Sequence, residues 1–468
     1  MNSELATTFP TLVQYDQQQV LRFWDQLDSA ERDRLRGQVD ALDLEQLARL
    51  IGGQDDATDF ESLAARAATP PAVGADGSGM PWSVDEAGVR GEQALRDGKV
   101  AAILVAGGQG TRLGFDLPKG MFPIGPVSGK TLFQVFADKL LAKQARYGVK
   151  IPWYIMTSEA TDQPTREYFE ANDYLGLDAG QIRIFKQGTM PAVDAATGKI
   201  LLADRGSIAL SPDGHGGTVA ALSRSGCLAD AKSRGIEQLF YFQVDNPLVT
   251  LCDHKLIGHH LLAGSQITTQ VVRKRYPKEK VGIVVQADDQ VRIIEYSDLP
   301  DQAAEATDAD GRLKLWAGNI AVHVIDIDFL ESAANSESAL PYHRASKKVP
   351  HVDSSGQLVS PTEPNAIKFE RFIFDLLPAA KTAIVVEVKP EEAFAPVKNA
   401  DGAANDTPGL AKKAIVALHR QWLEEAGVAV DSDVQVEIDP RLAESPEELA
   451  ANIDTKSRIS QHRYLSVD

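Results

Sequence analysis

Cysteine is nearly absent from this sequence. Only Cys227 and Cys252 occur in 468 residues, and neither lies in a C-x-x-C pair or in a cysteine–histidine array. Such arrays hold structural zinc or form redox disulfides, so the sequence supports neither kind of site. A disulfide between the two cysteines stays open, but two cysteines in so long a chain favour reduced, packed thiols and a reducing compartment.

Long apolar runs are missing as well. The opening residues MNSELATTFPTLVQYDQ have neither the basic segment nor the apolar core of a secretion signal. No later stretch approaches the roughly 20 apolar residues that a membrane helix needs. We therefore expect a cytoplasmic protein with no membrane partner.

Positive charge is scarce relative to negative charge. The chain carries 48 Lys and Arg against 66 Asp and Glu, a net charge of −18. A broadly acidic surface repels phosphate backbones, which argues against nucleic acid as a partner. Any polyanionic ligand must then be held by a local cluster of cations and backbone amides. Loops that combine glycine with lysine or arginine become informative for this reason.

Composition and local pattern divide the chain into three parts. Apolar residues make up 43% and charged residues 24%, which is ordinary globular usage. Residues 11–51 favour helices, and residues 67–80 form a Pro/Gly/Ala-rich linker. We predict an N-terminal helical unit with its linker over 1–95, a larger α/β domain over 96–389, and a small C-terminal domain over 390–468.

Strand-like runs define the middle part. KVAAILVAGG is an unbroken apolar run ending in glycines, which favours a strand buried on both faces. Further strands are predicted over 151–157, 181–185, 238–244, 268–272, 281–285 and 381–388. Helical patterns lie between several of them, including TLFQVFADKLLAKQARYG, where Thr131 and Gln134 fit a capping box. This alternation predicts an α/β layered domain with a largely parallel sheet.

A glycine-rich loop directly after the first of these strands is the strongest local signal. Its sequence is LVAGGQGTRLG, followed by LPKG. Glycines let backbone amides close on phosphate oxygens, and Arg112 and Lys119 add positive charge. In open α/β sheets, ligands bind beyond the carboxyl ends of strands. The residues expected to line this phosphate site are Gly107, Gly108, Gly110 and Thr111.

Two other phosphate-binding motifs fail on spacing. The dinucleotide fingerprint is G-x-G-x-x-G, whereas Gly108, Gly110 and Gly114 give G-x-G-x-x-x-G, and a cationic loop follows instead of a helix. This argues against an NAD-dependent dehydrogenase. GPVSGKT resembles a P-loop but is one residue short between its glycines, so we expect Lys130 and Thr131 to begin the next helix instead.

The pattern GGQGTRLG…PKGM resembles the nucleotide-binding motif of eukaryotic-type UDP-sugar pyrophosphorylases, most closely the UDP-N-acetylhexosamine pyrophosphorylase family. The resemblance covers most of the chain, from FWDQL near the N-terminus to KNAD at 398–401. It implies a Rossmann-like, GT-A-like nucleotidyltransferase fold with a central mixed, mainly parallel sheet. It also implies that UTP and N-acetylglucosamine 1-phosphate react to give UDP-N-acetylglucosamine and pyrophosphate.

The resemblance also implies how the nucleotide and metal are bound. Gln187 offers a donor and an acceptor to the uracil edge, and the backbone at Gly214 lies close to the base. Asp245, which ends the buried run FYFQVD, is implied as the ligand of Mg²⁺.

Three cations are implied to act in catalysis. Arg112 and Lys119 stabilise the departing pyrophosphate, and Lys398 holds the incoming sugar phosphate. A non-catalytic UDP-sugar sensor is the alternative from another functional class. Such a sensor has no need for all three cations together with Asp245, so the sequence favours the enzyme.

The sequence leaves the identity of the sugar open between two branches of the family. The resemblance implies a sugar pocket made by His215, Gly282, Glu295, Asn319 and Phe372. At the position of His215 the N-acetylhexosamine branch usually carries asparagine, whereas the glucose branch has G-H-G. UTP–glucose-1-phosphate specificity, or broad specificity, therefore stays open, as does the oligomeric state.

Overall fold

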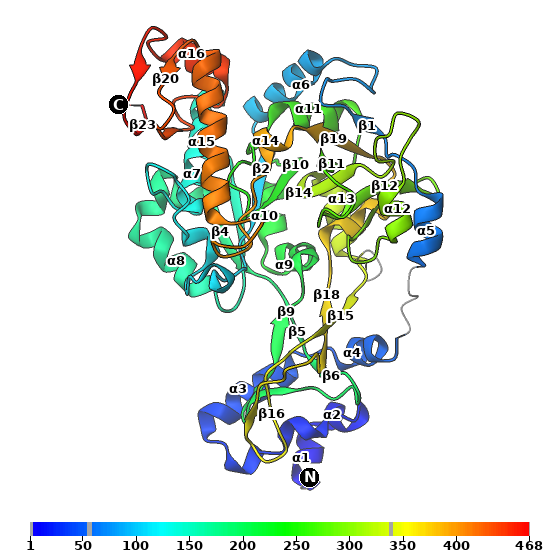
Figure 1. Cartoon of the computed structure of the whole chain (residues 1–468). Helices are drawn as coiled ribbons and strands as arrows, with labels where there is room; N and C mark the ends of the chain where they lie inside the picture. Colours follow the sequence, from blue (N-terminus) through cyan, green and yellow to red (C-terminus); the bar gives the residue numbers. More distant parts are fainter. Residues whose placement is uncertain (1–2, 54–58, 337–339, 468) are drawn as a thin grey trace. The chain divides into compact units, whose positions relative to one another are not determined.

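The computed structural model describes residues 3–53, 59–336 and 340–467 (Figure 1). The chain forms two compact units, each assembled from separate stretches. Unit 1 contains Met1–Thr58, Gln187–Thr218 and Glu337–Asp375, and unit 2 contains Asp59–Lys186, Val219–Ser336 and Leu376–Asp468. This division follows compactness rather than chain order, and the boundaries predicted at residues 95 and 389 stay a prediction. Within the described ranges, no helix has both the length and the hydropathy that a membrane crossing requires.

A large mixed sheet lies at the centre of unit 2 (Figure 1). Its main path is β1 (Ala72–Val73), β19 (Ala383–Val388), β11 (Ile267–Arg273), β14 (Ala317–Asp326), β10 (Gln238–Gln243), β2 (Val100–Val105), β3 (Trp153–Thr157) and β4 (Ile182–Lys186). Along this path only β14 runs antiparallel to its neighbours, β10 and β11. The hairpin of β12 (Ile283–Ala287) and β13 (Gln290–Ile294) joins the sheet at β14. The predicted α/β class with a mixed, mainly parallel sheet is confirmed.

The strands in the middle of the sheet are buried on both faces, as their continuous apolar sequences predict. Helix α7 (Leu132–Tyr147) packs onto one of these strands, with the rings of Phe136 and Phe242 5.2 Å apart. Thr131 caps this helix by accepting a hydrogen bond from the backbone N–H of Gln134 at 3.2 Å. The predicted start of the helix is therefore confirmed.

Strand direction brings several loops to one edge of the sheet. The strands β2 and β10 are parallel, with Val105 beside Gln243, so their carboxyl ends lie together. The strands β11 and β19 run the same way as β10, because β11 and β10 are both antiparallel to β14. The loops that follow β2, β10 and β19 therefore leave from the same edge, and β14 begins there.

A C-terminal segment, residues 408–467, completes unit 2. Helix α15 (Pro408–Glu425) begins at Pro408, because Thr407 accepts a hydrogen bond from Leu410 N and proline fits the first turn. Around it lie α16 (Pro446–Asn452) and the strand pairs β20 (Ala429–Val430) with β22 (Arg458–Ile459) and β21 (Val436–Ile438) with β23 (Arg463–Leu465). These elements share their own apolar cluster, which includes Leu423, Val436 and Leu449.

Unit 1 is built on an N-terminal group of short helices and small sheets. Its helices are α1 (Ser3–Thr8), α2 (Pro10–Gln14), α3 (Ser29–Asp40) and α4 (Leu44–Ile51), and its three-stranded sheet is β15 (His343–Lys347), β18 (Ala366–Glu370) and β6 (Val193–Asp194). Asp28 and Glu31 form a capping box at the start of α3. The helical prediction for 11–51 is confirmed for α3 and α4, whereas the apolar residues between 18 and 26 lie in short 3-10 turns, Gln18–Leu21 and Trp24–Gln26.

The remaining elements connect these parts. The helices are α5 (Phe60–Arg66), α6 (Val84–Arg96), α8 (Asp162–Ala171), α9 (Thr218–Arg224), α10 (Cys227–Ser233), α11 (His254–Leu262), α12 (Asp301–Glu305), α13 (Ile327–Ala334) and α14 (Pro390–Ala393). The short strands are β5 (Thr189–Pro191), β7 (Leu202–Asp204), β8 (Ser207–Ile208), β9 (Leu210–Pro212), β16 (His351–Val352) and β17 (Leu358–Val359). Cys227 and Cys252 are both buried and free, which excludes the disulfide that the sequence left open.

Candidate functional site

The glycine-rich loop leaves β2 and folds back on itself. Gly110 N donates to Leu117 O at 2.9 Å, and Lys119 N donates to Gly108 O at 3.1 Å. A Cβ on Gly110 would stand 2.6 Å from the carbonyl oxygen of Phe115, so only glycine allows this closure. Gly108 is exposed, and a Cβ there would meet nothing within 4 Å. The loop thus presents open backbone beyond the carboxyl edge of the sheet, as predicted for a phosphate site.

Lys119 is the most enclosed cation of this region. Its ammonium donates to Val397 O at 3.2 Å. Burial lowers the pKa of Lys119, the carboxylate of Asp245 raises it, and the positive charges of Lys398 and Arg112 lower it again. Asp245, Lys398 and Arg112 therefore all lie within electrostatic reach of Lys119, although the four residues come from three separate stretches of the chain.

The charges in this group do not cancel. Arg112, Lys119, Lys398 and Asp245, hereafter the phosphate cluster, carry three positive charges and one negative charge. A second carboxylate, that of Asp406, lies within electrostatic reach of Lys398 and Asp245. The whole chain carries a net charge of −18, so the positive potential of this cluster is local and opposite in sign to that of the whole protein. Neighbouring cations repel one another, and a bound polyanion relieves that repulsion. The three cations predicted to bind phosphate and the aspartate predicted to bind the metal all belong to unit 2.

The segment that carries Lys398 is fixed by its backbone. Val397 N donates to Asp245 O at 2.8 Å, which ties the segment to the end of β10. On the other side, Lys398 N donates to Asp406 O at 2.7 Å. Burial raises the pKa of the Asp406 carboxyl, while the positive charge of Lys398 lowers it. Lys398 is therefore delivered to the cluster by a loop held at both ends.

Asp245 is a half-buried carboxylate that follows the carboxyl end of β10. In the part of the chain that the structure describes, no three His, Cys, Asp or Glu side chains gather to form a metal cage. Mg²⁺ is commonly held by one or two carboxylates, with waters and substrate phosphates filling the other positions. A single hard oxygen ligand beside phosphate-binding cations therefore fits an Mg²⁺ ion that arrives with a triphosphate.

Three of the predicted sugar-binding residues meet at the start of β14. Asn319 N donates to Gly282 O at 2.8 Å, and a Cβ on Gly282 would stand 2.8 Å from a carboxylate oxygen of Glu295. A β-bulge interrupts the pairing of β11 with β14 here, and Ala321 has a φ of 57°. Asn319 Oδ1 accepts a hydrogen bond from Ala321 N at 2.9 Å, which orients the amide so that its NH₂ group can donate outward.

The other predicted ligand residues belong to unit 1. Gly188 O, next to Gln187, accepts a hydrogen bond from Asp213 N at 3.1 Å, which joins the Gln187 turn to the Gly214 turn. Gly214 has a φ of 84°, and a Cβ on it would stand 2.4 Å from Arg371 O. Gly214 is therefore required for close backbone packing, independently of any role in binding the base.

His215 and Phe372 are neighbours in this unit. Their ring centroids are 5.3 Å apart, and Phe374 lies 5.6 Å from His215 and 5.1 Å from Phe372. The Nδ1 atom of His215 accepts a hydrogen bond from Ile373 N at 3.2 Å, so the neutral ring carries its proton on Nε2. The imidazole is thus oriented by the backbone and packed against aromatic rings.

Sequence reasoning missed two side chains that support these groups. Arg371 forms an ion pair with buried Asp213 at 2.6 Å and so braces the Gly214 turn. Asn246 is 3% exposed and hydrogen-bonds to both Ala393 and Ala395. The only available signal for Asn246 was its place directly after Asp245 at the end of a buried strand. Its partners are backbone atoms far along the chain, which no motif shows.

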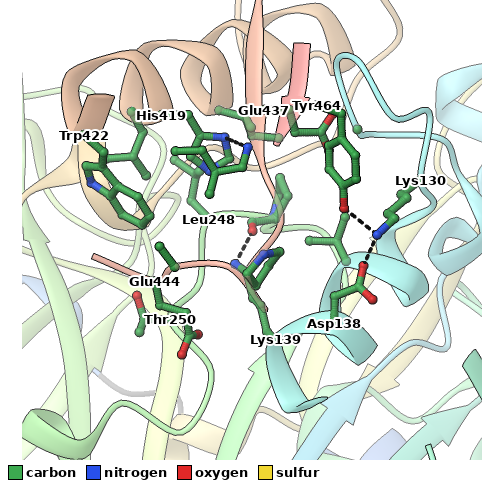
Figure 2. Close-up of a pocket in the computed structure, with 18 of the residues that line it drawn as sticks. Lys130, Asp138, Lys139, Leu248, Thr250, His419, Trp422, Glu437, Glu444 and Tyr464 are labelled. Carbon is green, nitrogen blue, oxygen red and sulfur yellow. Dashed lines mark hydrogen bonds and ion pairs between the residues drawn. The ribbon is translucent and has the colours of Figure 1, made fainter. Parts of the chain in front are cut away.

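A separate cavity of about 80 Å³ lies among α7, α15 and the turn after Asp245 (Figure 2). On one side of it, Lys130 pairs with Asp138 at 2.7 Å and donates to the Tyr464 hydroxyl at 2.5 Å. Lys130 therefore fastens the C-terminal segment to α7, which agrees with its exclusion as a P-loop lysine. Lys139 donates to Pro247 O and Val249 O, each at 2.7 Å.

Comparison with known proteins shows to which family this chain is similar. The sequence profile described as UTP–glucose-1-phosphate uridylyltransferase matches residues 84–438. A protein from Xenopus tropicalis named UDP-N-acetylhexosamine pyrophosphorylase-like protein 1 is 40% identical over 425 residues, which cover 88% of this chain and 83% of that protein.

Two further relatives are similar over long stretches. The UDP-N-acetylglucosamine pyrophosphorylase of Saccharomyces cerevisiae is 41% identical over 368 residues, 77% of either chain. The crystal structure of the uridine diphosphate N-acetylglucosamine pyrophosphorylase from Trypanosoma brucei, solved with an inhibitor, aligns with a TM-score of 0.81 at 26% identity. That alignment covers 99% of this chain and 98% of the other. These are similarities in sequence and fold over nearly the whole chain.

Proposed function

Because this chain belongs to the family of UTP–glucose-1-phosphate uridylyltransferases, we propose that it joins UTP to N-acetylglucosamine 1-phosphate, releasing pyrophosphate and forming UDP-N-acetylglucosamine. The observation that carries this proposal is the phosphate cluster: three cations and one carboxylate gathered at the carboxyl edge of the sheet. A polyanionic substrate balances the excess positive charge that this cluster has by itself.

The choice of sugar follows the similar proteins. The relatives from Xenopus tropicalis and Saccharomyces cerevisiae are named for N-acetylhexosamine and N-acetylglucosamine. Asn319 is compatible with this choice and with glucose, because an amide held by the bulge can donate to an acetamido oxygen or to a hydroxyl. UTP–glucose-1-phosphate or broad specificity is the second candidate, and His215 in place of the usual asparagine is the observation that favours it.

The reaction is an in-line transfer at the α-phosphorus of UTP. A sugar-phosphate oxygen forms a bond to this phosphorus, while the bond to the bridging oxygen of the β-phosphate breaks and its electron pair leaves with pyrophosphate. The nucleophile is already an anion, so no general base is needed. Catalysis then depends on holding two mutually repelling anions together and on stabilising the charge that develops.

Each member of the phosphate cluster takes one part of this task. Arg112 and Lys119 hold the β- and γ-phosphates as they depart, with the backbone amides of Gly107, Gly108, Gly110 and Thr111. Lys398 holds the incoming sugar phosphate against its repulsion by UTP. Asp245 would hold Mg²⁺ brought in with the triphosphate, and when bound the ion neutralises charge on phosphate oxygens.

The remaining roles concern recognition. We assign the uracil to Gln187 and to the backbone at Gly214, and the sugar to His215, Gly282, Glu295, Asn319 and Phe372. We also propose the cytoplasm as the compartment, which the two free, buried cysteines support, because thiols persist under reducing conditions.

A pyrophosphate-release assay with a panel of sugar 1-phosphates tests this proposal. With UTP and Mg²⁺ we expect pyrophosphate with N-acetylglucosamine 1-phosphate, and less with glucose 1-phosphate. Calorimetry on the same preparation measures nucleotide binding separately. Tight UDP-sugar binding without pyrophosphate from any pair would instead identify a non-catalytic sensor.

A further inference from the structure

The turn that follows β10 is fastened on two sides by side chains that do not belong to the phosphate cluster. On one side, Asn246 Nδ2 donates to Ala393 O at 2.8 Å, and Asn246 Oδ1 accepts from Ala395 N at 3.1 Å. One side-chain amide thus bonds both a carbonyl and an N–H group of the segment that leads to Lys398. Because Asn246 is buried, its polar atoms depend on these partners rather than on water.

The other side of the turn faces the cavity of Figure 2. There, Lys139 of α7 donates to Pro247 O and Val249 O. These hydrogen bonds hold the turn on the side where it borders the cavity and has fewer packing partners. The turn is therefore held by hydrogen bonds from α7 on one side and by the Asn246 amide on the other. Asp245 stands at the start of this turn, so its backbone has little freedom to shift.

The Asn246 bonds also set the register of the segment 393–397 against Asp245. The bonds at Ala393 and Ala395 are followed, two residues on, by the bond from Val397 N to Asp245 O at 2.8 Å. The carbonyl of Val397 in turn accepts from Lys119 at 3.2 Å. Loss of the Asn246 amide leaves only the last contacts of this series to place Lys398.

We propose that Asn246 is a positioning residue, whose side-chain amide aligns the Lys398 segment with Asp245 and so sets the distance between the two substrate phosphates. This inference rests on the proposed function, because it assumes that Lys398 binds the sugar phosphate. Asn246 itself touches no substrate. Its effect on the rate passes through Lys398.

The experiment compares Asn246→Ala with wild type, in the native background and in a Lys398→Ala background. A displacement of about 1 Å at a reacting centre can cost on the order of 10²-fold in rate, so we expect kcat to fall ten- to a hundredfold in the native background. The KM for UTP should change by less than about threefold, since the glycine-rich loop is untouched. In the Lys398→Ala background, Asn246→Ala should lower kcat by no more than about twofold, because coupled residues are not additive.

Asn246→Asp provides a second variant of the same size, for use if Asn246→Ala fails to fold. It keeps an acceptor for Ala395 N and loses the amide donor to Ala393 O, but it adds a carboxyl group beside Asp245, so the Mg²⁺ dependence is measured together with kcat. The matched control is Gln181→Ala. Gln181 is also buried and donates to a backbone carbonyl, that of Ile151 at 2.9 Å, but it precedes β4 at the opposite end of the parallel strands. The control should keep wild-type kcat.

Three outcomes would overturn the inference. Unchanged kcat in Asn246→Ala and Asn246→Asp would show that Asn246 does not position the Lys398 segment. Equal losses with and without Lys398 would show that Asn246 acts independently of that residue, and an equal loss in Gln181→Ala would show a general effect of removing a buried amide. Failure of the proposed function looks different: wild type itself would then release no pyrophosphate.

Discussion

Among single residues, Lys398 carries the sharpest expectation. It is half-buried, it sits in the phosphate cluster, and its loop is held at both ends by backbone hydrogen bonds. Removing a preorganised electrostatic group typically costs ~10²–10³-fold in turnover. We therefore expect Lys398→Ala to lower kcat for pyrophosphate release by about that factor. Near-wild-type turnover, measured with both substrates saturating, would exclude Lys398 from the chemistry.

Asp245 is the residue on which the metal depends. The described residues offer no three-ligand cage that could replace it. We predict that activity requires a divalent ion and that Asp245→Ala loses at least about 10²-fold in kcat. Titrating Mg²⁺ into wild type and variant measures this directly. Full wild-type activity in excess chelator would refute the metal role.

His215 determines which sugar is preferred in this account. Its Nδ1 atom accepts from Ile373 N, and an asparagine oxygen at the same place can accept that bond. We expect His215→Asn to fold normally and to raise the ratio of kcat/KM for N-acetylglucosamine 1-phosphate over glucose 1-phosphate by about tenfold, as one hydrogen bond allows. An unchanged ratio would place specificity elsewhere in the pocket.

Among the helices and strands, α15 carries a buried histidine, His419, that should make the stability of the protein depend on pH. Its His419 accepts a hydrogen bond from Ile438 N at 3.1 Å, and burial lowers the pKa of His419 to about 3 from an ordinary 6.5. Between these values the unfolded chain takes up a proton that the folded chain does not. The free energy of unfolding therefore falls as pH drops below about 6.5, by roughly 2 kcal/mol at pH 5 from this group.

The matched variant for this prediction is His419→Gln, which keeps an acceptor for Ile438 N but does not titrate. Denaturant unfolding at pH 7.5 and pH 5 should show a smaller acid-dependent loss in the variant than in wild type. Identical losses in the two proteins would mean that His419 is not kept neutral by the fold.

The elements also show how far sequence reasoning reaches. Strands such as β2 and β10 were predictable because they are buried on both faces and read as continuous apolar runs. Strand β14 was not recognised as a strand, because Gly318, Asn319 and His323 interrupt its apolar pattern. Those polar residues are tolerated because a bulge and side-chain hydrogen bonds satisfy them, as in the contact of Thr269 with His323 at 3.0 Å. Tertiary partners of this kind cannot be read from a local pattern.

The candidate site was predictable to a similar degree. Arg112, Lys119, Asp245 and Lys398 all follow strands that run in the same direction, so strand direction brings their loops to one edge of the sheet. Asn246 was missed because its partner Ala393 is 147 residues away and contributes only a backbone atom. Motifs thus identified the groups proposed to meet substrate but not the groups that hold them in place.

For the molecule as a whole, unit 1 combines the first part of the chain with two later stretches. A division of the sequence into consecutive segments could not predict this arrangement. Its core joins Phe9 and Trp24 to Ile200 and Phe369, residues far apart in sequence. The net charge of −18 is a property of the whole chain, whereas the phosphate cluster is locally positive. In this account binding of a triphosphate depends on one positive region within an otherwise acidic protein.

A crystal structure of the protein with UTP and Mg²⁺ tests that central claim most directly. We expect the triphosphate over the glycine-rich loop, with Arg112 and Lys119 on its outer phosphates, the metal on Asp245 and Lys398 beside the α-phosphate. A nucleotide bound elsewhere, with these four side chains left without phosphate or metal, would contradict the account.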